Sequence, residues 1–279
     1  MRLKLGISPC PNDTFIFDAM LHGKIDTEGI EFEYILEDVE TLNKMALGAT
    51  LDLSKVSYGV VPKLLPNYRL LDAGGALGKG VGPLFISQKN DIVTSNSLHE
   101  LSVVLPGMHT TAHLLFSLAF PEIRKKIFLP FHEIENAVLN GVADTGVIIH
   151  ENRFTYSSKG LHKLADLGDL WETNTGLPIP LGGIVSKRSL DVTLSRKINR
   201  IIRSSLVYAF ENMDVLPSFV TDNAQEMEES VMRKHIDLYV NDFSLGLGSS
   251  GRSAVWKLLE ASSVLYPEPA GGNFEIFLD

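Results

Sequence analysis

Strand-like and helix-like patterns alternate along this chain, and the alternation restricts its fold more than any other feature. Runs that alternate apolar and polar residues predict strands, and apolar residues at helical spacing predict the helices between them. Such an order is typical of α/β folds in which crossover helices connect parallel strands. The elements predicted in residues 1–88 are strands Leu3–Ile7, Ile30–Ile35, Leu51–Val56, Tyr68–Ala73 and Pro83–Ser87 and helices near Phe15–Leu21, Val39–Leu47 and Tyr58–Leu65.

The same order of patterns begins again at residue 102 and predicts a second lobe. In both halves a helix ends at a glycine, an aspartate precedes the next strand, and a polar residue follows that strand. This weak similarity between the two halves gives Ser57 and His150 corresponding positions. The elements predicted here are strands Ser102–Leu105, Ile127–Leu129 and Thr145–Ile149 and helices Thr110 or Thr111 to Phe120 and Glu133–Leu139.

The Gly- and Pro-rich stretch Gly176–Gly183 predicts a rigid return crossing, followed by a strand at Ile184–Ser186. Lobe one is therefore predicted at residues 1–88 plus 185–279 and lobe two at residues 89–184, with a ligand cleft between them. Ligands of open parallel sheets bind beyond the carboxyl ends of the strands. The helices predicted after the return are Leu190–Glu211, Glu226–Val240 and Arg252–Ala261.

Composition narrows the classes of partner. The 279 residues carry a formal net charge of -9, and 44% of them are hydrophobic. Without a basic cluster interleaved with aromatic residues, the chain is not expected to bind nucleic acid or an anionic membrane surface. No apolar segment has the length of a secretory signal or a membrane span, so we expect a cytoplasmic protein. Cys10 is the only cysteine, which excludes an internal disulfide.

The turn that follows the first strand, Ser8–Thr14, is predicted to attract an anion. Its prolines stiffen the backbone, and Asn12, Asp13 and Thr14 offer side chains that can cap the next helix. We also expect these three residues to contact the substrate across the cleft. Asp13 either orients a histidine or a ligand hydroxyl, or serves only as the helix cap. Cys10 is interpreted as a small packing residue rather than a nucleophile.

Two further segments offer chemistry at strand ends. His150 follows a strand and is either a general base near neutral pH or a histidine bonded to nearby backbone. Thr110 and Thr111 lie where a strand passes into a helix, where their hydroxyls and free amides can bind a carboxylate. We favour ligand binding over capping alone for these two threonines, and we expect a small anionic substrate.

Two motif-like spacings are not expected to form sites. His109 and His113 have the i, i+4 spacing of a zinc motif, but the glutamate between them and a third ligand are missing. The stretch Gly246–Gly251 matches a dinucleotide-binding pattern by letter, yet it follows a helical segment rather than a strand. We therefore predict no metal and no nucleotide cofactor, and interpret Gly246–Gly251 as a flexible connection.

Five segments together resemble the 1,4-dihydroxy-6-naphthoate synthases of the futalosine route to menaquinone. The resemblance runs from residue 3 to about residue 260 and is carried by Ser8–Phe15, Lys55–Tyr58, Pro106–His113, Val147–Glu151 and Leu177–Gly183.

The resemblance implies an α/β fold of two lobes, similar to class-two periplasmic solute-binding proteins. It also implies a cofactor-independent lyase that converts cyclic dehypoxanthine futalosine to 1,4-dihydroxy-6-naphthoate and a sugar-derived fragment. His150 would be the proton acceptor, and residues of both lobes would contact the substrate: Lys55, Val56, Ser57, Thr110 and Thr111. The alternatives are a solute-binding protein of the same fold and the sibling chorismate dehydratase.

Overall fold

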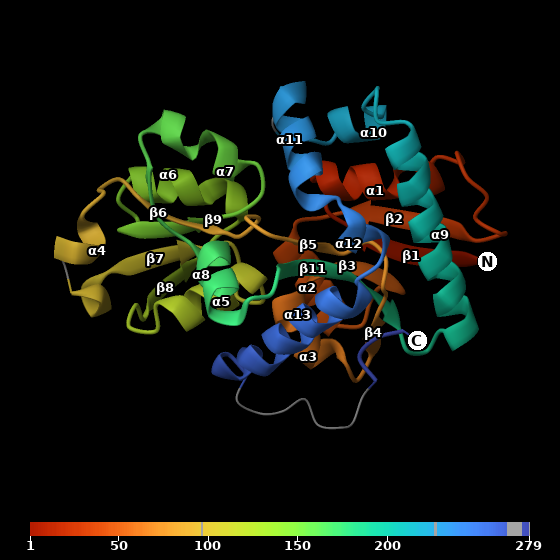
Figure 1. Cartoon of the computed structure of the whole chain (residues 1–279), viewed down its shortest axis with the longest axis horizontal. Helices are drawn as coiled ribbons and strands as arrows, with labels where there is room; N and C mark the ends of the chain where they lie inside the picture. The colour runs from red at the N-terminus through yellow and green to blue at the C-terminus, as the bar shows by residue number, and fades with distance from the viewer. Residues whose placement is uncertain (96, 226–227, 267–274, 279) are drawn as a thin grey trace.

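A computed structural model describes residues 1–95, 97–225, 228–266 and 275–278. The chain forms two β-sheets that lie beside one another, each flanked by helices (Figure 1). The sheets confirm the predicted two-lobed α/β fold. In the first sheet the strands run in the order β2-β1-β3-β11-β4, with β5 paired to β11. These strands are β1 (Arg2–Ile7), β2 (Glu31–Leu36), β3 (Leu53–Ser57), β4 (Tyr68–Leu70), β5 (Ala76–Gly78) and β11 (Ile179–Lys187).

The second sheet has the order β10-β6-β9-β7-β8. Its strands are β6 (Leu84–Ser87), β7 (Ser102–Leu105), β8 (Lys125–Phe128), β9 (Thr145–Ile148) and β10 (His162–Asp166). In each sheet the strand that leads into the pocket, β3 or β9, is buried along its whole length. α2 packs against β3, and α6 packs against β9, so a helix covers one face of each strand.

Both sheets are mixed, which corrects the prediction of parallel sheets. β1 is parallel to β2 and β3, and β7 is parallel to β8 and β9. However, β11 runs antiparallel to β3, β4 and β5, and β6 runs antiparallel to β9 and β10. The reason is topological: β6 carries the chain into the second sheet and β11 carries it back, so no single crossover helix joins either strand to a preceding strand of its own sheet.

The return segment is itself a strand. β11 begins at Ile179, and its register shifts between Pro180 and Gly182, where the proline cannot donate to the ladder. β11 therefore starts before the predicted boundary at residue 185. Likewise β6 pairs within the second sheet, although it precedes the predicted boundary at residue 88. We propose that the lobes divide near residues 83 and 178.

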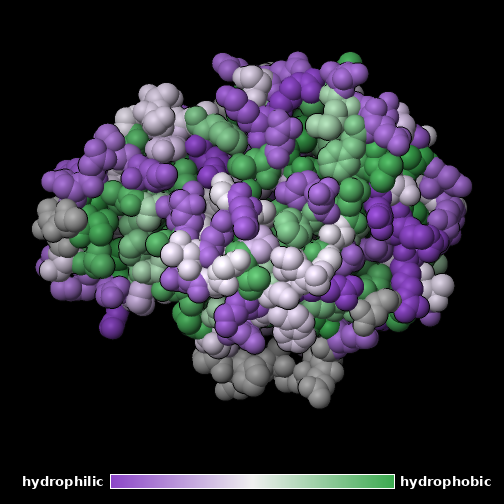
Figure 2. All heavy atoms as spheres, viewed as in Figure 1, coloured by the Kyte–Doolittle hydropathy of each residue, from purple (hydrophilic) through white to green (hydrophobic). Residues whose placement is uncertain are grey.

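Helices of the first lobe lie both above and below its sheet in Figure 1. They are α1 (Pro11–Leu21), α2 (Val39–Leu47), α3 (Val61–Leu64), α9 (Val192–Glu211), α10 (Ser218–Thr221), α11 (Glu229–Tyr239), α12 (Asp242–Leu245) and α13 (Gly248–Ala261). α9 buries one apolar stripe, while hydrophilic residues gather over the outer faces of α9 and α11 (Figure 2). α13 begins at Gly248, so most of the glycine-rich stretch is the first turn of a helix. The predicted helix start at Glu226 lies outside the described residues.

Helices of the second lobe are α4 (Ile92–Ser95), α5 (Thr111–Ala119), α6 (Ile134–Leu139), α7 (Asn152–Thr155) and α8 (Leu167–Thr175). One cluster of buried apolar side chains continues from lobe to lobe, joining Tyr58 and Val255 of the first to Phe85 and Phe116 of the second. The lobes therefore share a packed side, made by α5, α13 and the 3-10 turn Tyr58–Val60. Across the described residues, no helix has both the length and the apolar character needed to span a membrane.

Candidate active site

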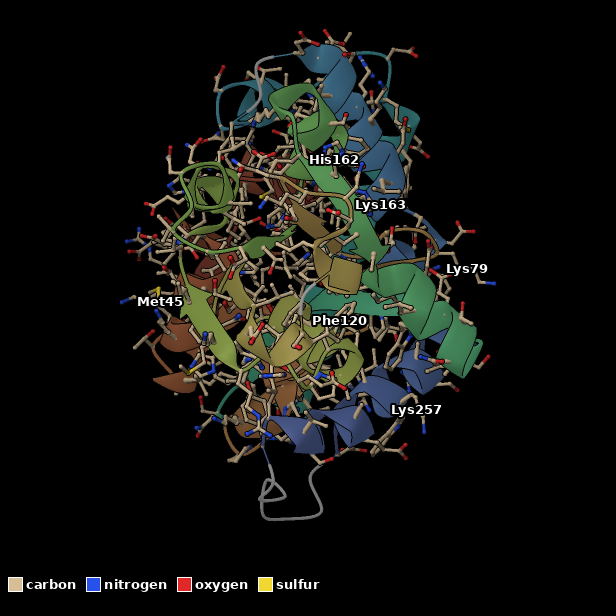
Figure 3. The ribbon with its side chains drawn as sticks, turned by 90° about the vertical axis from the view of Figure 1, so that its left-hand side faces the viewer. Met45, Lys79, Phe120, His162, Lys163 and Lys257 are labelled. Carbon is tan, nitrogen blue, oxygen red and sulfur yellow. The ribbon has the colours of Figure 1, made fainter. Side chains whose placement is uncertain are left out.

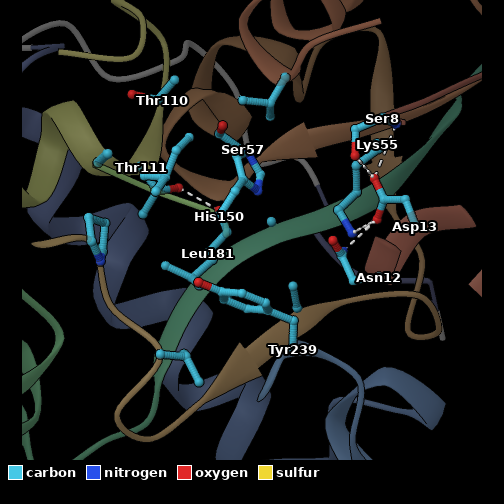
Figure 4. Close-up of a pocket in the computed structure, with 17 residues that line it drawn as sticks. Ser8, Asn12, Asp13, Lys55, Ser57, Thr110, Thr111, His150, Leu181 and Tyr239 are labelled. Carbon is cyan, nitrogen blue, oxygen red and sulfur yellow. Dashed lines mark hydrogen bonds and ion pairs between the residues drawn. The ribbon is translucent and has the colours of Figure 1, made fainter. Parts of the chain in front are cut away.

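One pocket between the two sheets collects most of the residues proposed from the sequence (Figure 4). The first lobe contributes the turn after β1 and the end of β3, and the second contributes the start of α5 and the end of β9. The predicted residues that line this pocket are Asn12, Asp13, Lys55, Ser57, Thr110, Thr111 and His150.

Two predicted residues have side chains that do not line the pocket. Alternation along β3 directs Lys55 and Ser57 to the pocket face and Val56 into the apolar core. Thr14 is fully buried, and its hydroxyl donates to the carbonyl oxygens of Cys10 and Pro11. The helix begins earlier than predicted, because Cys10 is its N-cap and Pro11 its first residue. Asn12 and Asp13 therefore lie in the first helical turn and do not cap it.

Asp13 and Lys55 form a buried ion pair at the wall of the first lobe. Lys55 Nζ lies 2.7 Å from Asp13 Oδ1, with side-chain exposures of 6% and 1%. Asp13 also accepts hydrogen bonds from Ser8 N, Ser8 Oγ and Asn12 Nδ2 at 3.2, 2.7 and 2.9 Å. The carboxylate is thus satisfied on both oxygens, which fits a charge held in the interior. Asp13 does not touch a histidine directly; it orients Asn12.

His150 lies directly after β9 with φ at +58°, in the left-handed region that non-glycine residues rarely adopt. Its ring lies between Phe131, with centroids 4.8 Å apart, and His235, 6.0 Å away and nearly parallel. Nε2 of His150 is buried and has no hydrogen-bond partner among the described residues. Burial is the main cause that lowers the pKa of His150 to about 4, and nearby Asp13 opposes it. The imidazole is therefore an uncharged base at neutral pH.

The start of α5 faces His150 across the pocket. Thr110 is the N-cap of α5, since its hydroxyl accepts from His113 N and donates to Gly107 O. The Thr111 hydroxyl donates to Leu181 O and accepts from Gly59 N, so it ties α5 to the first lobe. Each hydroxyl already donates its hydrogen to a backbone carbonyl oxygen, so it can only accept a hydrogen bond from a ligand. The donors available to an anion here are therefore the backbone amides in the first turn of α5.

The other predicted polar residues have defined places. Asn43 on α2 fixes Ser57 by donating to its Oγ at 3.1 Å and accepting from its N at 2.9 Å. Burial, followed by the charge of Glu151, raises the pKa of the Cys10 thiol well above its usual value, which favours the packing interpretation. His113 directs Nδ1 to Met108 O, and its Nε2 lies 3.3 Å from Lys126 Nζ. The ammonium group of Lys126 beside this nitrogen makes His113 unsuitable as a metal ligand.

Sequence reasoning missed the group behind His150. His235 is fully buried on α11, where its Nε2 lies 2.9 Å from Asn12 Oδ1 and its Nδ1 lies 3.5 Å from Glu151 Oε2. Tyr239, one turn later, lines the pocket and packs on His235 with ring centroids 4.7 Å apart. The sequence did contain a signal for this residue, because His235 lies in the apolar stripe of its helix, between Met232 and Ile236.

Comparison with known proteins gives this pocket its context. A family model described as menaquinone biosynthesis matches residues 3–263. The chain belongs to the menaquinone biosynthesis family. A 1,4-dihydroxy-6-naphthoate synthase from Streptomyces coelicolor is 41% identical over 275 residues, which cover 97% of this chain and 96% of that enzyme. Another from Thermus thermophilus is 41% identical over 270 residues, covering 96% and 97%. These matches confirm the resemblance found in the sequence.

Solved structures agree with the family assignment. A protein from Archaeoglobus fulgidus superposes with a TM-score of 0.88 at 32% identity, covering 96% of this chain and 98% of that one. The periplasmic aliphatic sulphonate binding protein SsuA from Escherichia coli gives a TM-score of 0.65 at 11% identity, covering 96% and 89%. The second likeness concerns the fold alone, and it confirms the predicted similarity of the fold to periplasmic binding proteins.

Proposed function

We propose that the protein is a lyase that converts cyclic dehypoxanthine futalosine to 1,4-dihydroxy-6-naphthoate and a sugar-derived fragment, with His150 as general base. The observation that carries this proposal is the His150 ring, which lines the pocket uncharged and with Nε2 unpartnered among the described residues. A base of this kind can remove a proton from a substrate held in the pocket. The names of the two 41% identical relatives support the choice of product.

The rest of the pocket suits an aromatic carboxylate. The amides at the start of α5 offer donors for a carboxylate, and the positive end of the helix dipole adds to their effect. Apolar side chains provide surfaces for a ring, among them Val39, Val81, Ile149 and Leu181. We infer that the carboxylate lies at α5 and the ring system extends towards His150.

The reaction then needs little further assistance from the protein. Removal of one proton by His150 starts the ring opening, and formation of the aromatic naphthalene drives it forward. The buried ion pair of Asp13 and Lys55 keeps the opposite wall fixed, while exclusion of water protects the intermediate. That the enzyme works in the cytoplasm stays a prediction.

Turnover of the proposed substrate tests the function. The purified protein is incubated with cyclic dehypoxanthine futalosine, and 1,4-dihydroxy-6-naphthoate is followed by absorbance and mass spectrometry. We expect product from the unchanged protein and a rate at least about 100-fold lower for His150→Ala, because general-base catalysis contributes about that much or more. His162→Ala is the matched control, since His162 is exposed on β10 at the outer face of the second lobe (Figure 3).

The alternatives give different outcomes in the same assay. Tight binding of cyclic dehypoxanthine futalosine without turnover would identify a solute-binding protein. Consumption of chorismate, offered in parallel, would identify the sibling dehydratase. An undiminished rate for His150→Ala would remove His150 from the mechanism even if naphthoate is formed.

A further inference from the structure

Two side chains of α2, in the first lobe, hold the backbone of the second lobe beside the pocket. His109 precedes the N-cap of α5 and donates its amide to Glu40 Oε2 at 2.9 Å. The carbonyl oxygen of His109 accepts a hydrogen bond from Asn43 Nδ2 at 3.3 Å. Glu40 and Asn43 are both buried, with exposures of 8% and 0%. We refer to these two hydrogen bonds as the α2 clamp.

The sequence places both side chains on one face of α2. Residues three and four positions apart on a helix are neighbours on its surface, so Val39, Glu40 and Asn43 lie together. Val39 lines the pocket. The side chain of Asp38 caps the helix by accepting from Glu40 N at 2.9 Å. This cap determines where α2 begins, and therefore which of its residues face the second lobe.

The close approach of Glu40 requires a glycine in the loop that it contacts. A Cβ atom at Gly107 would lie 2.6 Å from Glu40 Oε2 and 2.7 Å from Glu40 Cβ, which is closer than such atoms can pack. The φ angle of Gly107 is +150°, a conformation that residues with a side chain rarely adopt. The carbonyl oxygen of Gly107 accepts from the Thr110 hydroxyl. The loop between β7 and α5 is therefore shaped to receive the Glu40 carboxyl group.

Asn43 also determines the direction of the Ser57 hydroxyl. The backbone amide of Ser57 can only donate, so the Asn43 atom that it contacts is the oxygen, and Asn43 Nδ2 must face Ser57 Oγ. The hydroxyl therefore accepts from Asn43, and within the described part of the chain its own hydrogen has no acceptor. Because Ser57 lines the pocket, this hydrogen is available to a ligand.

One side of the pocket thus gathers hydrogen-bond donors from both lobes. Ser57, Thr110 and Thr111 lie on the same side of the pocket in Figure 4. Thr111 and Ala112 are the first residues of α5, so their amides have no partner within the helix. Two amides and one hydroxyl are suited to a carboxylate. The α2 clamp connects the two sources of donors, because Asn43 bonds both to Ser57 and to the backbone before α5.

We propose that Glu40 and Asn43 are positioning residues that align the start of α5 with the Ser57 hydroxyl and so form the subsite for the carboxylate of the substrate. The inference rests on the proposed function for the identity of that substrate. Neither residue is among the described residues that line the pocket, so both act through the groups that they hold. The bond from His109 N needs only an acceptor oxygen on residue 40, and a negative charge there would oppose a bound anion. An uncharged acceptor should therefore replace Glu40.

Calorimetric titration with 2-naphthoate and 2-naphthamide measures the carboxylate subsite without turnover. The two probes share the same rings and differ in whether the attached group is charged. Glu40→Met keeps the length of the side chain and removes the acceptor, so we expect 2-naphthoate to bind about tenfold more weakly and 2-naphthamide to change by less than about twofold. Glu40→Gln retains an acceptor oxygen and should keep most of the affinity for 2-naphthoate. Glu33→Met is the matched control, because Glu33 is exposed on β2.

Three results of this titration would overturn the proposal. An equal loss of affinity for both probes in Glu40→Met would mean that the α2 clamp supports the fold and not the carboxylate subsite. An unchanged affinity for 2-naphthoate in Glu40→Met would mean that the clamp positions nothing. An unchanged protein that binds both probes equally would have no carboxylate subsite to position. Circular dichroism checks that each variant is folded, and Glu40→Ala, with the same expected result, replaces Glu40→Met if the latter does not fold.

Steady-state kinetics separate failure of the α2 clamp from failure of the proposed function. With cyclic dehypoxanthine futalosine, Glu40→Met should raise KM about tenfold with a smaller change in kcat, and Glu40→Gln should restore KM, because the subsite binds the substrate and His150 is untouched. Binding of 2-naphthoate that depends on Glu40, without formation of 1,4-dihydroxy-6-naphthoate, would reject the function and keep the clamp. Formation of 1,4-dihydroxy-6-naphthoate with the same KM in Glu40→Met would keep the function and reject the clamp.

Discussion

Replacing Lys55 by methionine tests the ion pair that fixes the wall of the first lobe. Methionine has similar length and no charge, so the substitution removes the 2.7 Å contact to Asp13 and leaves the space filled. Asp13 then remains as a buried carboxylate, with a side chain only 1% exposed. Breaking a buried pair in this way typically costs about 3–5 kcal/mol.

The structure indicates the lower end of that range. Asp13 keeps its hydrogen bonds from Ser8 N, Ser8 Oγ and Asn12 Nδ2, which continue to stabilise the charge. We therefore expect a loss of about 3 kcal/mol for Lys55→Met. Adding Asp13→Asn removes the stranded charge, so the double variant should regain at least about 1 kcal/mol.

Differential scanning calorimetry measures both effects. A loss of about 3 kcal/mol lowers Tm by about 6–12 °C for a chain of this size. Lys257→Met is the control, because Lys257 pairs with Glu260 at the surface of α13 (Figure 3), and it should stay within about 0.5 kcal/mol. A loss below about 1 kcal/mol for Lys55→Met, or a double variant less stable than Lys55→Met, would refute the reasoning.

Two further predictions concern the pocket. The kcat/KM should stay constant from pH 7 down to about pH 5 and fall by half near pH 4, because His150 is buried in the free enzyme with a pKa of about 4 and loses its basic form only below it; a midpoint near 6.5 would contradict this. Thr111→Val should raise KM about tenfold with a smaller change in kcat, since it removes the bonds to Leu181 O and Gly59 N that fix the start of α5; steady-state kinetics measure it, and an unchanged KM would contradict it.

The sequence predicted those elements whose pattern is local. The helix Val39–Leu47 has both of its predicted ends, and so does the strand Ser102–Leu105. Asp38 explains the first, because its side chain caps the helix start. β10 and α8 were missed, since His162–Asp166 is an edge strand with mixed polarity and Leu167–Thr175 carries few apolar residues. The direction of β11 depends on the crossing between lobes, which no local pattern records.

The candidate site divides in the same way. Ser57 and His150 follow from strand ends, while Lys55 was predicted only through the family resemblance. The alternation of β3 explains why Val56 turns into the core. The role of Asp13 required the structure, because its partner Lys55 lies 42 positions away. His235 lies 223 positions from Asn12, and only the packing of α11 on α1 brings them together.

Chemical rescue of His150→Ala tests the central claim, that the imidazole of His150 removes a proton from the substrate. The rate of 1,4-dihydroxy-6-naphthoate formation from cyclic dehypoxanthine futalosine is measured as imidazole is added at several pH values. The account predicts that the rate rises with the concentration of uncharged imidazole and that His162→Ala shows no response. A rate for His150→Ala that imidazole leaves unchanged, while cyclic dehypoxanthine futalosine still binds and the cavity admits imidazole, would contradict it.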